Sequence, residues 1–243
     1  MSGSSRELRF SLVIPLHDEE ENVAALLDEL AEVLPPLGAF EVVAVDDGSR
    51  DRTLERLLEG KERHPWLRVL ELEKCVGQSG ALCAGFDAAR GTYFCMMDGD
   101  RQNDPRDLEK MLLLLDEDRA DAVSGIRRKR RDNLVRRISS RVANKVRDWI
   151  TGDRVVDSAC GLKAFRREVW HGTPRFNGLH RFMPTLFRAR GWRVVEIDVN
   201  HRPRPAGRPK YGVGNRAFRG LVDSFGVRWL KARTVNPKVE KEY

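Results

Sequence analysis

Two aspartates, Asp98 and Asp100, end the apolar run 92–97 with only Gly99 between them. Two carboxylates this close to a buried segment repel each other and are costly to remove from water, so the pair predicts a bound cation. A hard divalent ion such as Mg²⁺ takes oxygen ligands and commonly bridges one or two carboxylates and the phosphates of a substrate. Gln102 adds an amide oxygen within reach. The alternative is a simple turn, because Asp-Gly-Asp is also favourable turn chemistry.

The segments that would position this pair alternate between strand and helix. Short apolar segments typical of buried strands occupy 9–15, 40–45, 67–72, 92–97 and 121–124. Helical patterns lie between them, at 22–34, 51–63, 77–89 and 105–115, the last with Asp104 as a predicted N-cap. This alternation predicts a single α/β domain whose mostly parallel central sheet is covered on both faces.

Polar residues follow three of the predicted strands, in the segments 15–19, 46–49 and 98–102. Ligands of parallel sheets bind beyond the carboxyl ends of the strands. We therefore expect the three segments to converge on one crevice, which favours the cation site over a simple turn at Asp98 and Asp100.

The second half of the chain is more basic and less regular. After a basic segment, 127–133, we predict a helix over 134–150, a strand opening at 157–161 and running through Phe165, a helix over 181–190 and a strand over 194–199. A loop rich in proline and glycine, 201–212, precedes a final helix over 213–232. We divide the chain into a catalytic domain, 1–212, and a C-terminal basic amphipathic helix with its tail, 213–243.

That final helix carries bulky apolar residues on one side and mostly basic residues on the other. Such a helix can lie in a membrane interface with an anionic surface, or it can pack its apolar side on the protein's own core. The sequence leaves both readings open.

The composition and the charge of the chain limit the classes of protein to which it can belong. The 243 residues carry a net charge of +7 and are 41% hydrophobic, enough for a full core. The basic clusters suit phosphates or an anionic membrane surface; they lack the interleaved aromatic residues of a nucleic-acid-binding motif. The apolar runs are shorter than the roughly 18 residues that span a bilayer, no signal-peptide pattern opens the chain, and the four cysteines lack zinc-ligand spacing. We expect a cytoplasmic protein, peripheral at the cytoplasmic face of the membrane, with neither zinc nor a disulfide.

The motifs at 15–20, 45–53 and 98–102, in this order, resemble the inverting family 2 glycosyltransferases of the GT-A fold, a Rossmann-like architecture. Later motifs, at 125–127, 157–165, 180–182, 201–204 and 210–212, resemble more narrowly the polyprenyl-phosphate sugar transferases of the dolichyl-phosphate mannose synthase type. Relatives commonly have Tyr-Asn at His17-Asp18, Asn at Cys75 and Ala at Gly99. Many also carry transmembrane helices, so attachment here is expected through amphipathic helices or a membrane-anchoring partner protein.

The resemblance implies a role for each motif. Mg²⁺ or Mn²⁺ would be bound by Asp98, Asp100 and Gln102. The nucleotide-sugar donor, a UDP- or GDP-sugar, would be held by Pro15, His17, Glu19, Asp47 and Gln78. The phosphate of a polyprenyl phosphate acceptor (undecaprenyl or dolichyl) would be held by Arg127 and Arg137, and Arg202 with Lys210 would close a loop over the donor phosphates.

The acceptor decides whether a general base is needed. A monoester phosphate has a second pKa of about 6 and is already largely a dianion at neutral pH, so it needs arginines for positioning more than a base. A sugar hydroxyl would need a base. Asp157 is the candidate for it, unless a salt bridge with a neighbouring arginine occupies this carboxylate. The alternatives are therefore a soluble family 2 enzyme acting on a glycan or small-molecule hydroxyl and, from another class, a nucleic-acid-binding protein.

Overall fold

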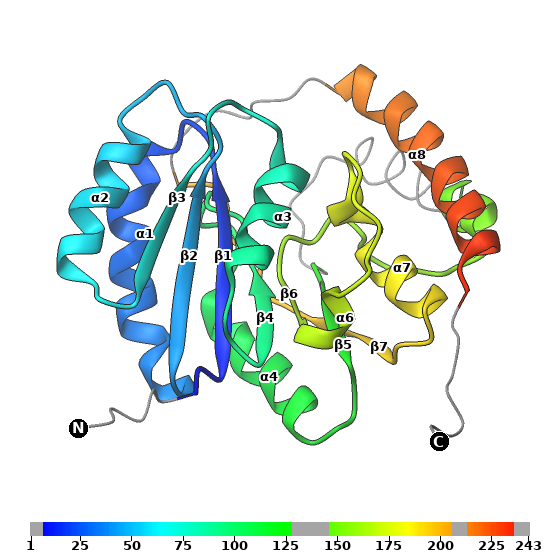
Figure 1. Ribbon diagram of the computed structural model, residues 1–243, viewed down its shortest axis with the longest axis horizontal. Helices are drawn as coiled ribbons and strands as arrows, with labels where there is room; N and C mark the ends of the chain where they lie inside the picture. Colours follow the sequence, from blue (N-terminus) through cyan, green and yellow to red (C-terminus); the bar gives the residue numbers. More distant parts are fainter. Residues whose placement is uncertain (1–6, 128–145, 206–212, 236–243) are drawn as a thin grey trace, which may run out of the picture.

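The computed structural model describes residues 7–127, 146–205 and 213–235, with side chains from residue 220 onward in the last range. In these ranges the chain forms a seven-stranded sheet in the order β3-β2-β1-β4-β6-β5-β7 (Figure 1). The strands are β1 Phe10–Leu16, β2 Phe40–Asp46, β3 Leu67–Glu71, β4 Tyr93–Met96, β5 Ala122–Ile126, β6 Lys163–Arg166 and β7 Val194–Asp198. Only β6 runs antiparallel to its neighbours, β4 and β5, which confirms the predicted mostly parallel α/β sheet.

Helices cover both faces of the sheet (Figure 1). One face packs against α1 Glu20–Val33, α2 Thr53–Arg63 and α4 Leu108–Asp116, and the other against α3 Gln78–Ala88, α6 Arg167–Trp170 and α7 Met183–Ala189. The strands are buried on both sides for this reason, and their continuous apolar sequences follow from it.

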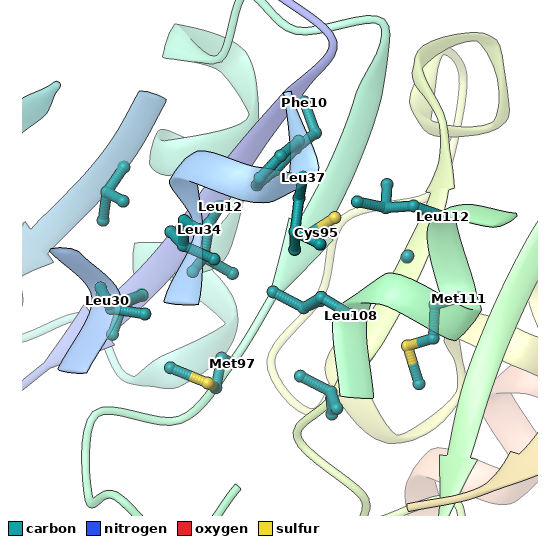
Figure 2. Packing of buried hydrophobic residues seen from close by; sticks show 14 of the residues in the cluster. Phe10, Leu12, Leu30, Leu34, Leu37, Cys95, Met97, Leu108, Met111 and Leu112 are labelled. Carbon is teal, nitrogen blue, oxygen red and sulfur yellow. The ribbon is translucent and has the colours of Figure 1, made fainter. Parts of the chain in front are cut away.

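The core beneath α1 is formed by apolar side chains that recur at helical spacing on one side of the helix. Val23, Leu26, Leu27 and Leu30 recur at helical spacing, and each is at most 2% exposed. Figure 2 shows Leu30 and Leu34 in the same buried cluster as Leu108, Met111 and Leu112 of α4, with Leu12 and Cys95 of the sheet between the two groups.

The predicted element boundaries mostly agree with the structure, and the differences have local causes. The helix predicted at 105–115 opens with a 3-10 turn, Pro105–Asp107, whose N-cap Asp104 accepts a hydrogen bond from the Arg106 N–H at 3.1 Å. This confirms the cap. Residues 157–162 form no strand, so β6 begins later than predicted, at Lys163. The helix predicted at 181–190 is a 3-10 turn, Leu179–Arg181, followed by α7, because Pro184 fits the first turn of a helix and not its interior.

Two predicted helices lie in the second half of the chain. Of the helix predicted at 134–150, the structure describes residues 146–151 as helical, and the remainder lies outside the described residues. The final helix is α8, Val213–Arg233, close to its predicted bounds. Within the described ranges, none of the helices combines the length and the apolar character that crossing a membrane requires.

Gly91 provides a test of the packing at the start of β4. A Cβ added here would lie 2.4 Å from the Phe10 carbonyl carbon and 2.5 Å from the Ser11 nitrogen, which are backbone atoms of the central strand. Gly91→Ala is therefore expected to lower the free energy of unfolding by about 1–3 kcal/mol, measured by urea denaturation. Gly226→Ala in α8, where nothing lies within 4 Å, should cause no loss. Equal stabilities of the Gly91 variant and the wild type would contradict this account.

Candidate active site

The loops after β1 and β2 are locked together at the carboxyl end of the sheet. His17 Nδ1 lies 2.7 Å from the Asp47 carbonyl oxygen, the Asp18 N–H donates to Ser49 Oγ at 3.0 Å, and the Arg50 N–H donates to Asp18 Oδ1 at 2.7 Å. Asp18 has a φ of 47°, a left-handed conformation that Asp and Asn tolerate better than most residues. These bonds hold the first two polar segments in one position.

The third segment lies against the first. A Cβ added at Gly99 would lie 3.0 Å from Leu16 Cγ and 3.3 Å from the Pro15 carbonyl oxygen, so the turn between the two aspartates packs directly on the end of β1. The predicted convergence of the three segments is confirmed.

Asp47 holds the backbone in place just before α3. It is 3% exposed, and its carboxylate accepts hydrogen bonds from the Val76 N–H at 2.7 Å and the Gly77 N–H at 2.9 Å. Gly77 has a φ of 85°, which favours glycine. This predicted donor-binding residue therefore also fixes the first turn of α3, where Gln78 lies.

A second set of contacts ties the same turn to the segment before α7. Ser79 Oγ accepts a hydrogen bond from the Gly178 N–H at 3.0 Å and lies 2.8 Å from His180 Nδ1. His180 thus has a structural contact, and this segment holds the start of α3 from the other side.

Asp98 and Asp100 are each anchored by neighbouring polar groups. Gln78 Nε2 donates to Asp98 Oδ1 at 2.7 Å, and the Gln102 N–H donates to Asp100 Oδ1 at 3.1 Å. A Cβ at Gly161 would lie 2.1 Å from Asp98 Oδ2, so only glycine leaves room for the carboxylate there. Gly161 thereby helps to fix the orientation of Asp98.

Burial and the neighbouring positive charges shift the pKa of Asp98 in opposite directions. Burial raises the pKa of Asp98 to about 6, and the adjacent charge of Asp100 adds to the rise, while Lys163, Arg127 and the hydrogen bond from Gln78 act in the opposite direction. Lys163 is 2% exposed and its Nζ donates to the Cys160 carbonyl; burial lowers the pKa of this ammonium. Lys163 was not predicted as a site residue; a lysine directly before the apolar residues Ala164 and Phe165 was the available signal.

Arg127 and Asp157 form a largely buried ion pair close enough to Asp98 for the Arg127 charge to act on it. Arg127 Nε donates to Asp157 Oδ2 at 2.7 Å and Nη2 donates to Oδ1 at 2.8 Å, with the two side chains 10% and 12% exposed. Of the two readings of Asp157, the structure shows the salt bridge. Arg137, the other predicted acceptor arginine, lies outside the described residues.

The loop after β7 brings Arg204, which was not predicted as a site residue, to Glu19 and Asp100. Arg202 pairs with Glu29 at 2.6 Å and with Asp104 at 2.7 Å, away from Asp100. Arg204 Nη2 instead lies 3.0 Å from Glu19 Oε1 and 3.3 Å from Asp100 Oδ2. Lys210 lies outside the described residues. The sequence placed Arg204 in a basic cluster but gave it no contact, because its partners are more than 100 residues away.

The chain is similar to known proteins over most of its length. Residues 11–172 match the family model described as glycosyl transferase family 2. The chain belongs to this family. It is 35% identical to a dodecaprenyl-phosphate galacturonate synthase of Rhizobium johnstonii over 96% of its own length and 70% of that protein. It is 34% identical to an undecaprenyl-phosphate 4-deoxy-4-formamido-L-arabinose transferase of Edwardsiella ictaluri over 84% of its own length, and it spans 63% of that relative.

Solved structures show the same fold. A mannosyltransferase of Pyrobaculum calidifontis in complex with GDP-Man and Mn²⁺ is 23% identical, with a TM-score of 0.66 over 96% of this chain and 67% of that one. A glucosyl-3-phosphoglycerate synthase of Mycobacterium tuberculosis in complex with Mn²⁺ and UDP is 18% identical, with a TM-score of 0.70 over 95% and 80%. The family 2 glycosyltransferase resemblance and the GT-A fold are confirmed.

The raised pKa of Asp98 predicts a pH-dependent cost to stability. The carboxyl group of Asp98 stays protonated in the folded state up to about pH 6, whereas in the unfolded state it ionises near pH 3.8. Between pH 3.8 and pH 6 the unfolded state therefore binds fewer protons than the folded state, and the free energy of unfolding falls as the pH rises. Asp98→Asn should therefore be more stable than the wild type above about pH 6, by about 1–3 kcal/mol in chelator-treated buffer. Urea denaturation across this pH range measures the difference.

The difference between the variant and the wild type should vanish below about pH 4, where both states of Asp98 are protonated. Asp28→Asn, which removes an exposed carboxylate on α1, controls for the loss of one negative charge. A wild type that is more stable than the Asp98 variant at neutral pH would overturn the electrostatic description of the site.

Proposed function

We propose that this protein transfers a sugar from a nucleotide diphosphate donor to the phosphate of a polyprenyl lipid. The observation that carries the proposal is the juxtaposition of the Asp98–Asp100 pair with Arg127, whose guanidinium is oriented by Asp157. One side suits a cation on the donor diphosphate, and the other suits a phosphate acceptor. The names of the relatives that match most of the chain support the same acceptor class.

The donor set at Asp98 and Asp100 fits a divalent ion. Two carboxylates lie at the rim of the sheet, and within the described ranges no third His, Cys, Asp or Glu side chain joins them in a metal-binding group. Mg²⁺ and Mn²⁺ bind through few protein carboxylates together with substrate phosphates. When bound by Asp98, Asp100 and Gln102, such an ion would neutralise charge on the departing diphosphate as a Lewis acid. Structural neighbours with Mn²⁺ and nucleotides support this assignment.

The donor nucleotide would bind beside the metal, on the loops after β1 and β2. Pro15, His17, Glu19 and Asp47 would line the base and ribose site, with Gln78 at its edge. Arg204 contacts Asp100 and Glu19, so a small movement of this side chain would place it on the donor phosphates, where its charge would oppose the charge of the leaving group. Arg202 and Lys210 would complete this basic loop.

The acceptor phosphate would be positioned by Arg127 and Arg137. A phosphate oxygen of the dianion attacks the anomeric carbon as the bond from that carbon to the nucleotide diphosphate breaks, and no proton needs to move. Attack from the side opposite the leaving group inverts the configuration. Asp157 would hold Arg127 in the orientation that a phosphate requires.

The second candidate is transfer to a hydroxyl of a glycan or small molecule, with Asp157 as the general base. Both oxygens of this carboxylate accept hydrogen bonds from Arg127, which occupies the positions that a substrate hydroxyl would use. We therefore favour the phosphate acceptor.

A lipid acceptor places the reaction at a membrane, and we propose peripheral attachment on the cytoplasmic face. The excess of 44 Lys and Arg over 37 Asp and Glu residues supports attraction to an anionic surface.

Replacing Asp100 with Ala should abolish sugar transfer, by at least about a hundredfold, because the cation would lose a ligand and the diphosphate its counter-charge. The measurement is transfer of radiolabelled sugar from UDP- and GDP-sugars to undecaprenyl phosphate with Mg²⁺ or Mn²⁺. Glu109→Ala, an exposed carboxylate on α4, is the matched control and should keep full activity. Normal turnover in a folded Asp100 variant would reject the metal site.

The variants Arg127→Ala and Asp157→Asn separate the two acceptor classes. Loss of the guanidinium should raise the KM for polyprenyl phosphate about tenfold or more, since charge-assisted hydrogen bonds to a phosphate are lost. Asp157→Asn should also raise this KM, because Arg127 loses its orienting partner, but kcat should stay within about threefold of the wild type.

If Asp157 is the general base, its replacement should instead lower kcat by about a hundredfold or more and leave the acceptor KM near that of the wild type. Steady-state kinetics with varied acceptor concentration distinguish these outcomes.

A further inference from the structure

The outward face of α8 is apolar and exposed. Val222 and Phe225 are each 54% exposed and Trp229 is 62% exposed, at helical spacing that places them on one side. The opposite side, with Ser224 at 2% and Val227 at 0%, packs on the domain. The smaller residues of α8 therefore pack on the domain, and its bulky apolar side chains point away from the domain. This favours the membrane-interface reading of the helix over packing of its bulky apolar side on the core.

A neighbouring helical turn adds a second exposed tryptophan. Trp149, within the helical residues 146–151, is 78% exposed. Arg228 donates to the Ile150 carbonyl at 3.1 Å, and Lys231 donates to the Thr151 carbonyl at 3.1 Å, so this turn lies beside the C-terminal half of α8 (Figure 1). Two helices thus contribute to one exposed region at the edge of the molecule remote from α1 and α2.

The charges around this region are mainly positive. Arg228 and Arg233 are exposed, and Lys231 lies between them in the sequence. The acidic Asp223 is turned toward the domain, because a Cβ added at Gly178 would lie 2.7 Å from Asp223 Oδ2. Apolar residues with tryptophan, flanked by cations whose stems can cover apolar surface, suit the boundary between headgroups and acyl chains. A neutral protein groove would not require the flanking cations.

We propose that the outward face of α8, together with Trp149, docks on an anionic phospholipid bilayer. The inference rests on the proposed function, because a polyprenyl phosphate acceptor resides in such a bilayer. It goes further in assigning the docking surface to Val222, Phe225, Trp229 and Trp149.

The docking surface is connected to the active site through few contacts. Asp223 of α8 lies against Gly178, whose N–H donates to Ser79 Oγ in the first turn of α3, and the preceding residue, Gln78, holds Asp98. A bilayer bound at α8 would therefore hold the carboxylate pair at a defined height above its surface.

The test is sedimentation of the full chain with vesicles of phosphatidylcholine mixed with phosphatidylglycerol, in a comparison of the wild type with a Phe225→Ser/Trp229→Ser double variant. Removing two aromatic side chains from the interface should weaken binding at least about tenfold. Trp149→Ser should give a smaller loss in the same direction. Leu58→Ser on α2, which changes a side chain of similar exposure at 48%, should bind like the wild type.

Unchanged vesicle binding by the double variant would overturn the proposal, as would equal binding of the wild type to pure phosphatidylcholine. A wild-type dimer in sedimentation velocity that the double variant abolishes would assign the face to a second copy of this chain instead.

Transfer to a short, water-soluble polyprenyl phosphate separates this inference from the proposed function. The double variant should retain that activity while losing transfer to vesicle-borne acceptor. If the wild type transfers sugar to neither acceptor, the proposed function fails, yet the vesicle-binding comparison still decides whether this face docks.

Discussion

The repulsion between two carboxylates at the edge of a buried strand is the constraint around which this molecule is arranged. Burial, together with the adjacent charge of Asp100, raises the pKa of Asp98 to about 6. The fold offsets part of this cost with an amide from Gln78 and with the positive charges of Lys163 and Arg127. In the proposed function, a divalent cation bound at the pair would offset the remainder, so that the folded state gives up stability for affinity for the ion.

The antiparallel strand in the described sheet explains how Asp157 and Arg127 come close to the carboxylate pair. β6 lies between β4 and β5, so Lys163 pairs in register with Met96 near the end of β4. The residues just before β6 then pass next to Asp98: Gly161 packs on its carboxylate, and Asp157 reaches Arg127 at the end of β5. The antiparallel direction of β6 therefore brings the Arg127–Asp157 ion pair close to the Asp98–Asp100 pair.

The sequence was sufficient where the signal was local. Apolar strands, helical periodicity and the cap at Asp104 predicted the elements, and the rule for parallel sheets predicted that three loops would converge. It was insufficient where partners are distant: Arg204 contacts Asp100 across 104 residues, and nothing near Gly161 indicates that a carboxylate lies on it. Periodicity also could not decide which side of α8 faces the domain, because small residues such as Ser224 pack inward as readily as large ones.

The most direct measurement is calorimetric titration of Mn²⁺ into the wild type and a Gly161→Ala variant, each with UDP or GDP present. The added methyl group would lie 2.1 Å from Asp98 Oδ2 and would therefore displace the Asp98 carboxylate. We predict saturable Mn²⁺ binding by the wild type in the presence of one of the two nucleotides, and affinity at least about tenfold weaker in the variant. Equal affinity in both proteins, or no binding by the wild type with either nucleotide, would contradict the account.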